Sequence, residues 1–76
     1  MVNQPKLIRL RAGFYITRDA QWRIVRRRFM GSSILVWYVE LWSPGEMRWI
    51  PASRSDTLSS ARAYLHSFIN ARAEHS

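Results

Sequence analysis

The sequence predicts an α+β fold: a three- to four-stranded antiparallel sheet packed on one C-terminal helix, in the order β-β-β-β-α or β-β-β-α. Residues 6–51 contain short segments with strand-like alternation or continuous apolar character, separated by turn residues. From residue 56 onward the apolar spacing changes to that of a helix. The length of 76 residues predicts a single domain, 1–76, with one small core.

The first half of the predicted sheet consists of an edge strand and a hairpin. Residues 1–5 are expected to form a flexible arm, and KLIRLRAG (6–13) alternates until Gly13 interrupts it. FYIT (14–17) and QWRIV (21–25) flank the turn-like RDA and predict a β-hairpin. An odd-length loop is favoured in this hairpin, because it separates the apolar and the more polar residues onto opposite faces of the sheet. One face would then carry Phe14, Ile16, Trp22 and Ile24, and the other Tyr15, Thr17, Arg23, Val25 and Arg27.

The second half contains the most apolar strand. ILVWYVELW (34–42) is typical of a central strand that is covered on both faces. SPGE (43–46) predicts a turn into MRWI (47–50). Pro51 cannot donate to a ladder, so the last strand is expected to lie at an edge or to end there. The turn predicts four pairs: Val39 with Ile50, Leu41 with Arg48, Trp42 with Met47 and Glu40 with Trp49.

The helix is predicted over residues 56–71, followed by a frayed tail at 72–76. Its apolar positions follow the i, i+3, i+4, i+7 pattern. A hydroxyl or carboxylate at Ser55, Asp56 or Thr57 can accept a bond from a free backbone N–H at its start. The predicted apolar positions are Leu58, Ala61, Leu65, Phe68 and Ile69, with Tyr64 beside them.

The charge is large and unevenly distributed. Twelve basic residues against five acids give a net charge of +7. Residues 1–30 hold eight of the basic residues and only one acid, whereas residues 31–76 are neutral overall. A charge concentrated in one part of the chain favours binding to a polyanion.

The sequence lacks the residue patterns of a catalytic or metal site. There is no cysteine, the five carboxylates are scattered, and no pair has acid/base spacing. His66, on the polar side of the predicted helix, and His75, in the tail, are expected to be solvated. We therefore expect no enzyme activity, no metal and no cofactor. The first ten residues lack the apolar core of a signal peptide and no run is long enough to span a membrane, which predicts a cytoplasmic protein with no membrane partner.

Two surfaces are candidates for function. The first is basic: strand alternation places Arg23 and Arg27 on the sheet face away from the helix and Arg26 on the opposite side. Arginine suits bidentate contacts to phosphate and guanine, and tyrosine stacks on bases. Edge charges that deter aggregation are the structural alternative. The candidate nucleic-acid-binding residues are Arg9, Arg11, Arg18, Arg23, Arg26, Arg27, Arg28, Arg48 and Tyr15.

The second surface is aromatic. If Leu35, Trp37, Val39 and Leu41 face the helix, the alternate residues lie on the other face of the sheet. Exposed Trp and Tyr are typical of protein interfaces. A second layer of structure, the arm or a homodimer could equally cover them. The candidate protein-interface residues are Tyr38, Trp42, Met47 and Trp49.

The stretch DTLSSARAYLHSF after a three-stranded sheet resembles the sheet-plus-helix DNA-binding modules of the AP2 and integrase arm-binding type. The similarity rests on Thr57, Ala61, Ala63, Tyr64 and the strand residue Trp22, and covers about residues 14–69. It implies a sheet that enters the major groove of DNA. Residues FMGSS and ILVWYVELW depart from the pattern of these modules. The resemblance implies base or phosphate contacts by Arg18, Arg23, Arg27 and Arg48.

The leading functional prediction is a small basic protein that binds nucleic acid through an Arg-rich sheet surface, with DNA favoured over RNA as the ligand. The short, Arg-rich, cysteine-free chain also resembles small accessory proteins of bacteriophages. The alternative is therefore a bacteriophage-type protein that binds and inhibits an acidic host protein through its Trp/Tyr face.

Overall fold

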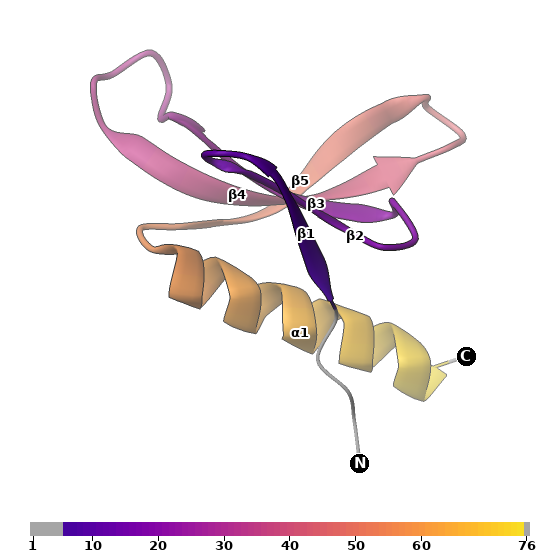
Figure 1. The fold of residues 1–76 in the computed structure, drawn as a ribbon. Helices are drawn as coiled ribbons and strands as arrows, with labels where there is room; N and C mark the ends of the chain where they lie inside the picture. The colour runs from indigo at the N-terminus through magenta and orange to yellow at the C-terminus, as the bar shows by residue number, and fades with distance from the viewer. Residues whose placement is uncertain (1–5, 76) are drawn as a thin grey trace.

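The computed structural model describes residues 6–75, with side chains as far as Arg72. These residues form five strands and one helix. They are β1 (Leu7–Arg11), β2 (Phe14–Thr17), β3 (Trp22–Arg28), β4 (Leu35–Ser43), β5 (Arg48–Ser55) and α1 (Leu58–His75). The strands form one antiparallel sheet in the order β1-β2-β3-β4-β5, and α1 lies across one face of it (Figure 1).

The predicted α+β class is confirmed, but the sheet has five strands instead of three or four. The predicted edge strand is present as β1, and it pairs with β2 through a two-residue turn in which Gly13 adopts φ 77°. A Cβ at this position would lie 3.3 Å from the Cβ of Arg26, and the Gly13 carbonyl accepts a hydrogen bond from the Arg26 N–H at 2.9 Å. Glycine is thus required by both its backbone angle and its close approach to β3.

The ends of the sheet and helix differ from the predicted bounds. β5 continues past Pro51 to Ser55, and α1 continues past Ala71 to His75. The predicted flexible arm, residues 1–5, lies outside the described residues. Pro51 does lie on an edge strand, as expected, since β5 pairs only with β4 in the described sheet.

The β2–β3 loop has four residues, so the predicted odd-length register is wrong. The observed pairs are Phe14 with Val25, Tyr15 with Ile24 and Ile16 with Arg23. Because paired residues share a face, Tyr15 and Thr17 lie on the helix side with Trp22 and Ile24. Arg23, Val25 and Arg27 share the other side with Phe14 and Ile16.

Hydrogen bonds within the loop explain this register. The Thr17 hydroxyl donates to the Asp19 carboxylate at 2.7 Å, and the Gln21 N–H donates to the same oxygen at 3.0 Å. The Ala20 N–H donates to the Thr17 carbonyl at 2.9 Å, with Ala20 in the left-handed region at φ 60°. A side chain that bonds the backbone two residues ahead closes the loop at four residues.

These bonds predict a pH dependence. Hydrogen bonds from the Thr17 hydroxyl and then from the Gln21 N–H lower the pKa of Asp19 below its ordinary value of 3.8. The stabilisation is present above the unfolded-state pKa and is lost as the pH falls through the lower folded-state pKa. We expect the free energy of unfolding of the wild type, relative to Asp19→Asn, to be greater at pH 6 than at pH 2.5, as measured by urea denaturation. Thr17→Val should move the pKa of Asp19 up in an NMR titration, and an unchanged pKa would contradict this account.

The β4–β5 register is shifted by two residues from the predicted one. Trp42 pairs with Trp49 and Leu41 with Ile50, while Met47 remains in the turn with φ 54°. Farther along, a bulge between Pro51 and Ser53 changes the pairing. A shift of two residues preserves the side-chain faces, so Trp42, Trp49 and Glu40 still lie on the side away from the helix.

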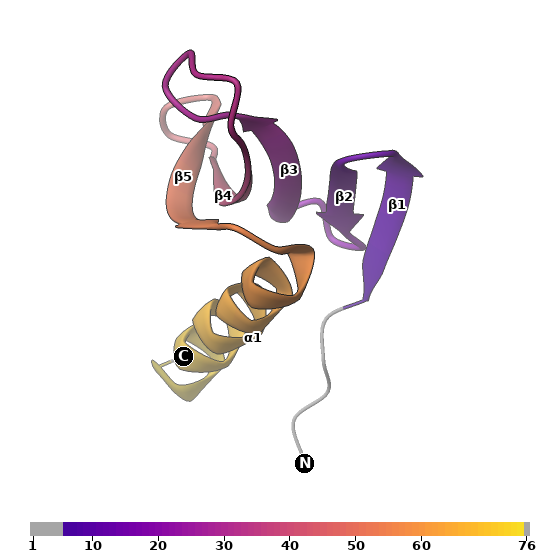
Figure 2. The ribbon, with the colours of Figure 1, turned by 90° about the vertical axis from the view of Figure 1, so that its left-hand side faces the viewer.

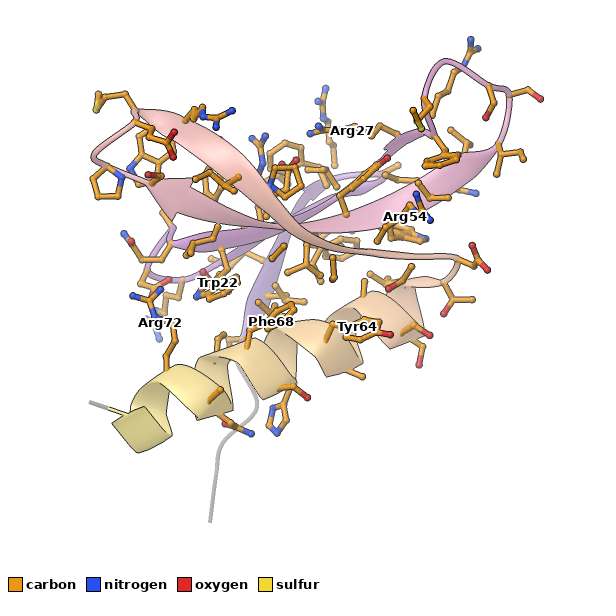
Figure 3. All side chains as sticks on the ribbon, turned by 180° about the vertical axis from the view of Figure 1, so that it is seen from behind. Trp22, Arg27, Arg54, Tyr64, Phe68 and Arg72 are labelled. Atoms are coloured by element: carbon orange, nitrogen blue, oxygen red, sulfur yellow. The ribbon has the colours of Figure 1, made fainter. Side chains whose placement is uncertain are left out.

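The core lies between α1 and the sheet, where the predicted helix stripe is confirmed. Ala61 and Leu65 are fully buried against Trp22, Ile24 and Val39. The Trp22 and Phe68 rings stack at a centroid distance of 5.8 Å with 6° between their planes (Figure 3). The Thr57 hydroxyl accepts a hydrogen bond from the Ser60 N–H at 3.1 Å, and is therefore the cap of α1.

The helix covers only part of the sheet. α1 packs under β3, β4 and β5, whereas β1 and β2 stand beside it (Figure 2). The opposite side of the sheet has no helix over it among the described residues, and we call that side the outer face. Its residues are Ile8, Arg11, Phe14, Ile16, Arg23, Val25, Arg27, Val36, Tyr38, Glu40, Trp42, Trp49, Pro51 and Arg54.

Candidate functional site

A buried carboxylate occupies the centre of the outer face. Glu40 is only 1% exposed and lies directly opposite Arg23 in the β3–β4 ladder. The Arg23 Nε donates to Glu40 Oε1 at 2.6 Å. Arg27, four residues farther along β3, contacts both carboxylate oxygens at 3.1 and 3.2 Å. One anion therefore fixes the positions of two arginines.

The arginines of the outer face stack on aromatic rings. The guanidinium carbon of Arg23 lies 4.4 Å from the Trp49 centroid, and that of Arg27 lies 5.6 Å from the Tyr38 centroid. Arg54 stands over a ring at the start of the β3–β4 loop, with its guanidinium carbon 4.1 Å from the Phe29 centroid (Figure 3). Attraction between a cation and the ring face restricts each guanidinium to a defined plane. Two further contacts join Arg11 and Arg23 to the Phe14 ring.

Beneath the arginines the outer face has an apolar layer of its own. Val25 and Val36 are each only 4% exposed, although α1 is on the other side of the sheet. Tyr38, Trp42 and Trp49 are half-buried, and the last two form an edge-to-face pair at 5.4 Å. The curled sheet thus folds aromatic side chains against one another and leaves charged groups outermost.

Not every arginine of the outer face contributes positive charge that a ligand could contact. Arg23 has a side chain only 19% exposed and is offset by Glu40. Arg27 keeps 48% of its side chain exposed, and Arg11 and Arg54 are exposed. Arg11, Arg27 and Arg54 therefore remain as exposed guanidiniums, a side-chain type that is suited to binding oxyanions.

The structure brings together only some of the predicted site residues. Arg11, Arg23 and Arg27 share the outer face with Tyr38, Trp42 and Trp49. Arg28 is exposed at the end of β3, Arg18 is exposed in the β2–β3 loop, and Met47 is 74% exposed in the β4–β5 turn. The others lie elsewhere: Arg9, Arg26 and Tyr15 on the helix side of the sheet, and Arg48 in an exposed ion pair with Glu46.

Tyr15 and Arg26 have structural contacts on the helix side. The Tyr15 ring packs 6.1 Å from that of Trp37, so its predicted place beside Arg23 and Arg27 is wrong. Arg26 lies over the same indole at 5.7 Å, on the side opposite to Arg27 as strand alternation predicts. Neither side chain reaches the outer face.

Sequence reasoning missed four members of the site: Phe14, Phe29, Glu40 and Arg54. The predicted sheet ends at Pro51, and simple alternation from Trp49 would place Arg54 on the helix side; the bulge after Pro51 brings it to the outer face beside Tyr38. Glu40 carried a signal, since a lone carboxylate inside a nine-residue apolar run is expected to be paired.

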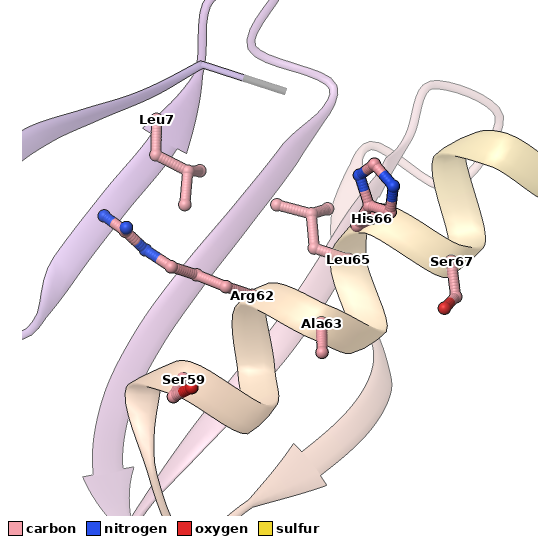
Figure 4. Close-up of a pocket in the computed structure, with 7 residues that line it drawn as sticks. All are labelled: Leu7, Ser59, Arg62, Ala63, Leu65, His66 and Ser67. Carbon is pink, nitrogen blue, oxygen red and sulfur yellow. The ribbon is translucent and has the colours of Figure 1, made fainter. Parts of the chain in front are cut away.

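A groove separates β1 from α1 on the other side of the molecule. It has a volume of about 680 Å³, and Leu7, Arg62, Leu65 and His66 are among its lining residues (Figure 4). His66 is half-buried there, whereas the prediction was a solvated side chain, and its Nδ1 has no hydrogen-bond partner among the residues that the structure describes. The groove exists because one helix is too narrow to cover five strands.

Among residues 6–75, whose side chains are described as far as Arg72, no cluster of three His, Asp or Glu side chains that could hold a metal ion is found. Within the same residues, no helix is long and apolar enough to cross a membrane. Comparisons with protein-family models, curated proteins and solved structures found no match to this chain.

Proposed function

We propose that the protein binds nucleic acid, DNA in preference to RNA, through its outer face, and that it does so without catalysing a reaction. The observation that carries this proposal is the order of the layers: arginines lie outermost, each stacked on an aromatic ring. A guanidinium held in a plane loses less conformational entropy when it forms a bidentate contact with phosphate. Phosphate contacts supply most of the affinity of such proteins.

The rest of the molecule supports this choice of ligand. The net charge of +7 favours association with a polyanion. The resemblance to AP2-type modules implies DNA contact by the sheet face opposite the helix, and that face carries Arg11, Arg27 and Arg54. A Thr-capped helix with Ala61 fully buried against the sheet is the feature of the resemblance that the fold contains.

The exposure of the aromatic residues favours DNA over the alternative of a host-protein target. Tyr38 and Trp49 are half-buried and have guanidiniums over their rings. A protein interface built on these rings would first have to displace their arginines. Of the four predicted interface residues, Met47 alone is a largely exposed hydrophobic side chain.

The proposal is tested by fluorescence anisotropy with a labelled duplex from about 50 to 200 mM salt. We expect binding that weakens steeply with salt, and Arg27→Ala should reduce the slope of log K against log salt by about one. The triple variant Arg11→Ala/Arg27→Ala/Arg54→Ala should reduce the slope by about three.

Arg62→Ala is the matched control, because Arg62 is exposed on α1 beside the Tyr15 ring, on the helix side of the sheet. It removes the same charge and should leave the slope nearly unchanged. Equal effects of Arg27→Ala and Arg62→Ala would mean that net charge alone drives binding. No binding at about 50 mM salt would reject the proposal, and a salt-tolerant protein complex that is lost in Trp49→Ala would favour the host-protein alternative.

A further inference from the structure

Two hairpin tips carry exposed apolar side chains at either end of the outer face. Met30 is 84% exposed and Ile34 is 61% exposed in the β3–β4 loop, and Met47 is 74% exposed in the β4–β5 turn. Both tips rise from the sheet on the side away from α1 (Figure 1). The outer face therefore lies between two apolar projections.

The β3–β4 tip has a defined shape that holds its apolar side chains outward. The Phe29 N–H donates to the Ile34 carbonyl at 2.8 Å, and the Ser32 N–H donates to the Phe29 carbonyl at 2.9 Å. Met30 and Gly31 both adopt left-handed backbone angles, φ 47° and 79°. A positive φ at a non-glycine residue is uncommon, so the backbone of this tip has a specific turn shape, and the Met30 side chain is 84% exposed on it.

The base of this tip is strongly cationic. Arg26, Arg27 and Arg28 precede it and are exposed. Residues 20–39 contain no Asp or Glu. An apolar tip on a cationic base is complementary to a base-pair step of duplex DNA. The step has phosphates on its outside and, between the stacked bases, an apolar space into which a side chain can insert.

The spacing of the tips also fits a duplex. β4 joins the two loops and has nine residues, which corresponds to a length of about 30 Å at ~3.3 Å per residue. That length equals about nine base pairs at ~3.4 Å each. Steps about nine base pairs apart are nearly one helical turn apart and present the same groove to the same side. Kinks at both steps would therefore add in one direction.

We propose that the protein bends duplex DNA, with Met30 and Ile34 at one tip and Met47 at the other inserting into two base-pair steps. Arg27 and Arg28 contact the phosphates beside the first step. This inference rests on the proposed DNA binding of the outer face. Inserted apolar wedges kink a duplex by about 20–90° each.

The test combines anisotropy with energy transfer between dyes at the two ends of a duplex of about 30 base pairs. Wild-type protein should raise the transfer efficiency when it binds. The double variant Met30→Ser/Ile34→Ser should bind within about threefold of wild type, because the arginines remain, but should lose about half or more of the change in transfer. Met47→Ser should lose the contribution of the second kink.

Leu10→Ser is the matched control, since Leu10 is also a largely exposed apolar side chain, 57% exposed, but belongs to β1 and to neither tip. It should bend DNA like wild type. A duplex with two flexible TA steps about nine base pairs apart should bend more than one with the steps about five apart, where the kinks oppose each other.

Four outcomes would overturn the proposal. Binding without a change in transfer would leave DNA binding by the outer face standing and reject bending. A double variant that bends DNA like wild type would show that the tips do not insert into the duplex. The proposal would also fail if the tip substitutions abolished co-sedimentation of the protein with phosphatidylserine vesicles but left DNA bending unchanged. The absence of any duplex binding would reject the proposed function and bending together.

Discussion

Glu40→Ala is expected to lower the free energy of unfolding by about 3–5 kcal/mol. The substitution leaves the Arg23 guanidinium, with a side chain only 19% exposed, without the carboxylate that it contacts at 2.6 Å. Arginine cannot deprotonate to escape the cost of burial. Arg27 loses the same partner, so two like charges remain close together on one face. Urea denaturation followed by tryptophan fluorescence measures the change.

Glu46→Ala supplies the comparison for this prediction. Glu46 also pairs with an arginine, at 3.2 Å from Arg48, but both side chains are more than half exposed. Exposed pairs contribute about 0–1 kcal/mol, so this variant should be close to wild type. If Glu40→Ala destabilises the protein no more than Glu46→Ala does, the stacking of Arg23 on Trp49 must be sufficient to hold the guanidinium without the carboxylate.

Leu65→Ala is expected to have an effect of similar size, about 3 kcal/mol, through the core. Leu65 has no exposed surface and packs among Trp22, Ile24, Val39 and Ala61. Truncation opens a cavity that a core with so few residues cannot close by rearrangement. In a chain of this length, such a loss should lower the melting temperature by roughly 10 °C or more.

The corresponding control is Leu10→Ala, at a leucine that is 57% exposed. The chemical change is identical, and the expected effect is within about 0.5 kcal/mol of zero. A comparable loss in both variants would show that the effect arises in the unfolded chain and not from packing against α1. Calorimetry of the two variants and the wild type decides between these possibilities.

The fold class was predictable because its main signals are local. The change of apolar spacing at residue 56 can be recognised from neighbouring residues alone, and Ala61 and Leu65 are buried as this spacing predicts. The turn at Pro44 and Gly45 correctly predicts that β4 and β5 form a hairpin, although not the register of their pairing. The helix-facing set of β4 was right for Trp37, Val39 and Leu41, whereas Leu35 is 45% exposed beyond the helix.

The strand registers were not predictable, because the assumption behind them was that only one sheet face is apolar. Phe14 and Val25 are as apolar as Trp22 and Ile24, yet they pack on the outer face. Nothing in their side chains distinguishes the two faces. The register of the β2–β3 hairpin is set by the hydrogen bonds that the Asp19 carboxylate accepts in the loop. The geometry of these bonds cannot be derived from the pattern of apolar residues.

The candidate site was predictable where strand alternation is unbroken. Arg23, Arg27 and Trp42 were placed on the correct side of the sheet by parity alone. Arg54 was lost at the bulge, and the burial of Glu40 between two arginines depends on a cross-strand pair. Which charges are neutralised and which stay available is a property of contacts between strands.

The order of the strands has a consequence for how the chain folds. Each strand pairs with the one before it, across loops of two, four, six and four residues. Closing such short loops costs little chain entropy, so the sheet can grow one hairpin at a time. α1 is last in this order, and its docking alone must bridge back to β3. During synthesis, Trp22, Ile24 and Val39 therefore stay uncovered until the helix leaves the ribosome, and this interval is when the chain is most prone to aggregate.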